Sequence, residues 1–305
     1  MIAPDGNQGS PPTPQGEVPA PPVARPASFI PVATPVVEHG AGPLSVRAVF
    51  PMIDQSPGKA TGDLAGVVGM LIAFGLLSAI ANLNGVIAAA VPELGELGWV
   101  FANGLVALAG IGVVLAMREQ SWRDIGLRAR PPRVWVLTTL VAIPASFAMG
   151  IASNVIFTTI RALMGAALTD QMRDRLEFIS AVSEIHLGWV FPVAIFVGIY
   201  EEILFRGFLL TRFTAITRSP LAGILLSSLL FGAVHFAQGW SGVFQTACVG
   251  LVLSLAAVRA QSLWPAILAH MTIDTISLAV SVWVRPELNQ FLHDLTTTTT
   301  AAAGG

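Results

Sequence analysis

Long apolar runs dominate the chain from Leu64 onward and recur as far as Val284. The hydrocarbon core of a bilayer is about 30 Å thick, so a helix needs about 20 predominantly apolar residues to cross it. We count seven such runs, at residues 64–91, 97–117, 134–160, 187–213, 220–237, 242–258 and 263–284. The pattern predicts an all-α fold, a polytopic transmembrane helix bundle with about seven spans, and eight spans are the alternative.

The two ends of the chain differ from this apolar body. Thirteen of the 21 prolines fall within residues 1–57, and the C-terminal end contains a run of threonines, alanines and glycines. Proline-rich segments cannot sustain a helix and are typical of polyproline-like or disordered chain. We therefore predict a disordered proline-rich tail at residues 1–60, a transmembrane domain at 61–285 and a low-complexity tail at 286–305.

Composition narrows the class of protein further. Hydrophobic residues make up 54% of the chain and charged residues 11%, against about 25% charged in a soluble domain. A net charge of -2 offers no basic surface for nucleic acid, so we expect none as a partner. Cys248 is the only cysteine, which excludes an intrachain disulfide. Glycine pairs such as Gly66 and Gly69 lie within apolar runs, so we expect no nucleotide or redox cofactor.

The distribution of charge predicts how the chain is oriented in a membrane. The segment between Arg118 and Arg133 contains five arginines and two acidic residues, and the positive-inside rule places such a loop in the cytoplasm. Alternation then places the acidic loop 92–96 outside and the N-terminal tail inside. The N-terminus also lacks the features of a secretory signal peptide, which suits a multi-pass protein with a cytoplasmic N-terminus.

A different periodicity appears between the third and fourth runs. Over residues 170–183, apolar side chains recur at helical spacing opposite acidic ones; the apolar set is Met172, Leu176, Ile179 and Val182. This pattern predicts an amphipathic helix at the membrane interface, and a satellite helix packed on the bundle explains it equally well. No internal repeat is evident, which weighs against an inverted-repeat transporter.

The fourth run contains charged residues that are unexpected in a bilayer. Ionisable side chains cost a few kcal/mol each at membrane depth, so they need partners or a purpose. Glu202 and Arg206 share one face of a helix at i, i+4, while Glu201 points about a quarter turn away. We predict that Arg206 holds Glu202 ionised and leaves Glu201 free to act as a base. A purely structural ion-pair network is the alternative.

Two further runs carry polar groups of the same kind. His235 lies deep in the predicted fifth helix, while His270 and Asp274 share a face of the seventh at i, i+4. Each could be a packing device, but three clusters on three helices favour one shared site. Zinc bound by Glu201, His235 and His270 could activate water. The same groups without a metal could do so with Glu201 as general base and His235 orienting the nucleophile.

The expected depth of His270 fits this site less well. The predicted seventh helix places it about 10 Å from the cytoplasmic end, against about 18 Å for Glu201 and about 22 Å for His235. Either the helix that starts at Trp264 and Pro265 begins deep in the membrane, or the predicted topology is locally wrong.

These residues resemble the motifs of the CPBP family of intramembrane proteases, which contains CAAX prenyl proteases and bacterial Abi or bacteriocin-immunity proteins. The matching motifs, in order, are Glu201-Glu202-x-x-x-Arg206, Phe231-x-x-x-His235 and His270-x-x-x-Asp274. The resemblance covers residues 187–284 through its motifs, and the earlier runs are compatible with it.

The resemblance implies an intramembrane endopeptidase in which Glu201 and His235 act on the hydrolytic water. It implies that Glu202, Arg206 and Phe231 support them, and that His270 and Asp274 stabilise the oxyanion or contribute metal ligands. Family members are often named metalloproteases, and zinc stays open here. The eukaryotic relatives have Asn in place of Asp274. Because an ionised Asp cannot donate a hydrogen bond, Asp274 must be protonated, orient His270 or bind a metal.

The expected partners are the bilayer and a membrane-associated peptide or protein, for which a prenylated CaaX protein is the eukaryotic precedent. Two other functions stay open. One is a catalytically silent immunity or scaffold protein on the same fold. The other is a proton-coupled transporter that uses Glu201, His235 and Asp274 as a relay.

Overall fold

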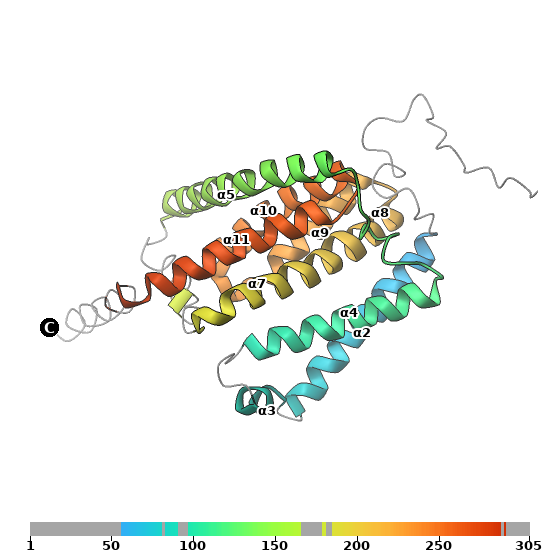
Figure 1. Ribbon diagram of the computed structural model, residues 1–305, viewed down its shortest axis with the longest axis horizontal. Coiled ribbons are helices and arrows are strands. Elements are labelled where there is room, and N and C mark those ends of the chain that lie inside the picture. Colours follow the sequence, from blue (N-terminus) through green and yellow to red (C-terminus); the bar gives the residue numbers. More distant parts are fainter. Residues whose placement is uncertain are drawn as a thin grey trace, which may run out of the picture. The chain divides into compact units, whose positions relative to one another are not determined.

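A computed structural model describes residues 56–80, 83–90, 97–165, 179–180, 185–287 and 290. The helices of this part are α2 (Pro57–Ile80), α3 (Leu83–Ala90), α4 (Leu97–Met117), α5 (Pro132–Leu163), α7 (Leu187–Glu202), the π-helix η2 (Ile203–Leu209), α8 (Leu210–Thr217), α9 (Pro220–Ala233), the 3₁₀ turn η3 (Phe236–Gln238), α10 (Gly239–Ala260) and α11 (Trp264–Trp283). The described residues contain no strand (Figure 1). The predicted all-α helix bundle is confirmed.

The lengths of these helices agree with an integral membrane protein. Five helical segments are long and apolar enough to cross a bilayer, namely residues 57–79, 98–117, 132–163, 236–260 and 264–283. Two other predicted runs are also helical: α7, η2 and α8 follow one another without a break, and α9 is a shorter apolar helix. Large apolar side chains such as Leu163 and Trp283 are 84% and 79% exposed, as expected for surfaces that contact lipid.

The first predicted run is wrong in its boundaries. Its residues lie in two helices, α2 and α3, where a single span was predicted. α2 begins earlier than the run, at Pro57, where Ser56 Oγ accepts a hydrogen bond from Lys59 N at 3.4 Å. The helix therefore starts inside the range assigned to the tail. Residues 1–55, the acidic loop 92–96 and most of the predicted amphipathic helix at 170–183 lie outside the described residues.

The helices that carry the predicted site pack against one another. α11 contacts α7 and α5, and α10 contacts α5, α9 and α11 (Figure 1). On its other side α7 contacts α4, which in turn contacts α2. Fully buried apolar side chains such as Phe208, Leu210 and Leu253 fill the spaces between them.

The start of α11, the helix that carries His270, is covered by another part of the chain. The turn before this helix is buried, with Ser262 and Leu263 both 0% exposed. Leu263 N donates to Gly126 O at 2.9 Å, and Ser262 Oγ donates to the carbonyl of Arg128 at 2.8 Å. The segment between α4 and α5 therefore covers this turn, and α11 begins within the bundle. The two predicted explanations concern depth in the membrane, and both stay predictions.

Candidate active site

The junction of α7 and η2 holds a buried ion pair. Arg206 Nη1 donates to Glu202 Oε1 at 2.6 Å, and both side chains are 0% exposed. Arg206 Nη2 also donates to the carbonyl of Gly250 at 3.3 Å, and its guanidinium lies 4.1 Å from the centroid of the Phe231 ring. The predicted pairing of Glu202 and Arg206 is present. A π-helical turn, such as η2, often occurs at functional sites.

His270 joins this pair from α11. Its Nδ1 lies 2.8 Å from Glu202 Oε1, and since a carboxylate accepts, the proton of this hydrogen bond lies on Nδ1. Its Nε2 lies 3.4 Å from Asp274 Oδ2 and 3.8 Å from Glu201 Oε2. Glu202 thus orients the ring, and Nε2 faces the two other carboxylates.

The expectation that His235 lies within an apolar helix is wrong. α9 ends at Ala233, and His235 lies in the turn that leads through η3 into α10. The chain turns here because α10 crosses directly over Gly232, where a Cβ atom would meet the backbone of Val243. His235 Nδ1 lies 2.6 Å from the carbonyl of Phe231, so it donates to one of the carbonyls that a helix end leaves without an intrahelical partner.

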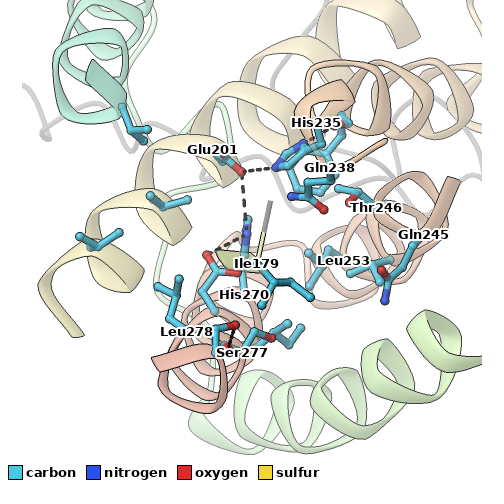
Figure 2. Close-up of a pocket in the computed structure, with 18 residues that line it drawn as sticks. Ile179, Glu201, His235, Gln238, Gln245, Thr246, Leu253, His270, Ser277 and Leu278 are labelled. Atoms are coloured by element: carbon cyan, nitrogen blue, oxygen red, sulfur yellow. Dashed lines mark hydrogen bonds and ion pairs between the residues drawn. The ribbon is translucent and has the colours of Figure 1, made fainter. Parts of the chain in front are cut away.

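This hydrogen bond determines which nitrogen of His235 can act as a base. With the proton on Nδ1, the neutral ring presents the lone pair of Nε2, which lies 3.9 Å from Glu201 Oε2. Glu201 is 7% exposed, and its Oε1 accepts a hydrogen bond from Tyr200 OH at 3.0 Å. Its Oε2 is buried and has no hydrogen-bond partner within the described part of the chain. Figure 2 shows this oxygen between the two histidines.

A cavity of about 410 Å³ opens beside this unpaired oxygen. Glu201, His235, His270 and Asp274 line it together with Phe231 (Figure 2), whereas Glu202 and Arg206 are not among the lining residues. Apolar side chains form much of the remaining wall, and its polar members are Gln238, Gln245, Thr246, Ser277 and Ser281. The four residues predicted to be catalytic therefore face one space.

The sequence motifs did not predict three residues of this site. Gln238 and Gln245 line the cavity from η3 and α10, but neither belongs to a charged cluster that would draw attention to it. Tyr200 contacts Glu201 directly. The sequence could have indicated Tyr200, because it is the only tyrosine of the chain and directly precedes the predicted base Glu201.

The predicted zinc ligands are close together without forming a metal site. Among the described residues, no three His, Cys, Asp or Glu side chains are placed to hold a metal ion. His270 Nδ1 is already bound to Glu202, and Glu201 is nearly 4 Å from each imidazole nitrogen that faces it. The donors as arranged do not fit a bound zinc ion, and the zinc requirement stays a prediction.

Comparison with known protein families finds a match over part of the chain. The model described as "Type II CAAX prenyl endopeptidase Rce1-like" matches residues 182–276. The matched segment contains every site residue from Glu201 to Asp274 and excludes α2, α4 and α5. No curated protein and no solved structure matches the chain.

Proposed function

We propose that this chain, whose residues 182–276 match the model of the type II CAAX prenyl endopeptidase family, is an intramembrane endopeptidase that uses a water activated by Glu201 and His235. One observation carries the proposal. The buried Glu201 Oε2 has no hydrogen-bond partner among the described residues and faces the Nε2 atoms of His235 and His270 at 3.9 and 3.8 Å beside a cavity. A lone carboxylate oxygen between two imidazoles is suited to general-base catalysis.

The first step is attack by water on the scissile carbonyl carbon. A water between Glu201 Oε2 and His235 Nε2 donates one hydrogen to each, because both atoms are acceptors. Its oxygen then presents a lone pair to the substrate. Glu201 takes the proton as the carbon–oxygen bond forms, and the carbonyl oxygen becomes an oxyanion.

The oxyanion lies within reach of His270. Glu202 holds Nδ1 of this ring, so Nε2 is the atom that can meet the substrate oxygen. When Nε2 also carries a proton, it donates a hydrogen bond to the oxygen on which negative charge develops. The carbon–nitrogen bond then breaks, and the leaving amine takes the proton held by Glu201. The products are one free carboxyl group and one free amine.

The cavity lies among membrane-spanning helices, which favours a substrate that is itself associated with the membrane. Apolar residues from α7, α10 and α11 line much of it, so an apolar peptide segment suits the wall. A prenylated CaaX-type peptide is the first substrate to test, because it is the class that the family description names.

The test is hydrolysis of a farnesylated CaaX peptide and of a membrane-peptide library by the purified protein in nanodiscs. We expect Glu201→Gln to lower kcat by about 10³-fold, within the range of lost acid–base catalysis, with an unchanged melting temperature. Glu119→Gln is the matched control, because Glu119 is exposed in the segment between α4 and α5, away from the cavity. Equal hydrolysis by the parent and Glu201→Gln would contradict the proposal.

The hydrolysis assay and an uptake measurement together distinguish the other predicted functions. No cleavage by any variant would favour a catalytically silent scaffold or immunity protein, and uptake driven by a pH gradient in proteoliposomes would favour a transporter. Loss of hydrolysis on chelation, restored by added zinc, would support the predicted metal.

A further inference from the structure

We infer that Tyr200 is a positioning residue for Glu201, and that Gly104 of α4 makes the space which this role requires. The inference rests on the proposed function of Glu201 as the base. Tyr200 OH donates to Glu201 Oε1 at 3.0 Å, and this is the oxygen that does not face the histidines. The bond therefore engages one carboxylate oxygen and leaves the other for water.

A contact between these neighbours is not a property of a helix alone. Side chains at i and i+1 diverge by about 100°, so a phenol reaches the next carboxylate only if its ring is held in a particular direction. Phe196, one turn earlier, holds it on one side, with ring centroids 5.3 Å apart. Phe196 is in turn stacked on Phe101 of α4 at 4.6 Å. An aromatic row thus links α4 to the base.

Gly104 lies directly behind this row. A Cβ atom at this position would lie 2.8 Å from Tyr200 Cδ1 and 2.6 Å from Phe196 Cε1, which is closer than side chains pack. Any other residue here would push both rings out of place. Tyr200 therefore keeps its direction because α4 has no side chain at this point.

This arrangement extends the active site beyond the matched family segment. The match begins at residue 182, whereas α4 spans Leu97–Met117. α4 also contributes Val100 to the cavity wall. A helix outside the match thus sets which oxygen of Glu201 faces the substrate.

Tyr200→Phe is the direct test, since it removes only the hydroxyl. We expect kcat to fall about tenfold, as for the loss of one hydrogen bond to a charged group, with unchanged KM and melting temperature. A structural role alone would change the melting temperature and leave kcat unaltered. Unchanged kcat, or a change confined to KM, would overturn the inference.

Gly104→Ala tests the same geometry without touching the hydroxyl. We expect a similar loss of kcat, and Gly112→Ala is the control on the same helix, because a Cβ atom there meets only Trp122 at an ordinary 3.4 Å. If Gly104 acts through Tyr200, adding Gly104→Ala to Tyr200→Phe should lower kcat little further. Additive losses would show that Gly104 acts by another route and would overturn that part of the inference.

A spectroscopic measurement separates this inference from the proposed function. Tyr200 is the only tyrosine, so its phenol bands can be followed by ultraviolet resonance Raman spectroscopy in the whole protein. We expect a donor hydrogen bond in the parent and a shift in Glu201→Gln. An unshifted band would overturn the inference even if Glu201→Gln is inactive. A shifted band in a protein that cleaves no peptide would overturn both the proposed function and the catalytic role of Tyr200.

Discussion

Two arginines of the continuous helix formed by α7, η2 and α8 show how differently a membrane protein can use a buried charge. Arg206 and Arg212 are both 0% exposed, and each guanidinium lies over an aromatic ring, at 4.1 Å from Phe231 and 4.6 Å from Phe208 respectively. Each also faces a buried carboxylate, Glu202 for Arg206 and Asp63 for Arg212.

The two clusters differ in how their carboxylate oxygens are paired. Asp63 uses both, with Oδ1 2.7 Å from Arg118 Nε and Oδ2 3.3 Å from Arg212 Nε. This cluster joins α2, α8 and the end of α4, and none of its members lines the cavity. At the other cluster, Glu201 lines the cavity, and its buried Oε2 has no hydrogen-bond partner among the residues that the structure describes. A carboxylate whose two oxygens both face arginines, away from the cavity, indicates structure, whereas a buried acceptor without a partner in a residue that lines the cavity indicates chemistry.

Among the variants that test this difference between the clusters, we expect Arg206→Ala to have the largest effect on stability and activity. Glu202 would be left buried without its cation, so we expect the free energy of unfolding to fall by about 3–5 kcal/mol. Hydrolysis should also be lost, because Glu202 orients His270. Denaturation curves and peptide hydrolysis in matched nanodiscs measure the two effects. Normal expression and melting would show that the pair contributes little to the fold.

A smaller effect, on stability alone, is expected from Asp63→Asn. The amide keeps one acceptor oxygen but removes the charge that two arginines share, so we expect a loss of about 3 kcal/mol. The protein that remains folded should keep its kcat within about twofold, since additivity holds for distant sites. Arg123→Ala, at an exposed position, is the control. A fall in kcat beyond the loss of folded protein would show that the two clusters are coupled.

The contrast between the clusters also shows which features of the fold and the site could be predicted from the sequence. The pairing of Glu202 with Arg206 was predictable because it follows from helical spacing, and the helix bundle follows from apolar runs. The turn that carries His235 and the buried start of α11 depend on tertiary contacts, of Gly232 with α10 and of Gly126 with Leu263, which no local pattern indicates. The pairing of Asp63 with Arg212 is of the same kind.

We expect Asp274→Asn to have the smallest effect of the three substitutions. It tests the role of Asp274, the residue that departs from the eukaryotic motif. Asp274 Oδ2 lies 3.4 Å from His270 Nε2, so its position suits orientation of that ring. An amide keeps an acceptor oxygen for the ring and adds a donor that can face the oxyanion, while it removes a negative charge nearby. We therefore expect kcat to change by less than about tenfold and to rise rather than fall.

Asp274→Leu is the matched comparison, because it removes the acceptor and keeps a side chain of similar size. His270 then loses its nearer partner at Nε2 and retains Glu202 at Nδ1 and the more distant Glu201, so we expect a clearly larger loss of kcat than for Asp274→Asn. Both variants should melt like the parent, since the Asp274 side chain is 27% exposed at the cavity. If Asp274→Asn loses as much activity as Asp274→Leu, the negative charge itself is required. The role of Asp274 would then be to hold His270 in its charged form or to bind a cation, rather than only to orient the ring.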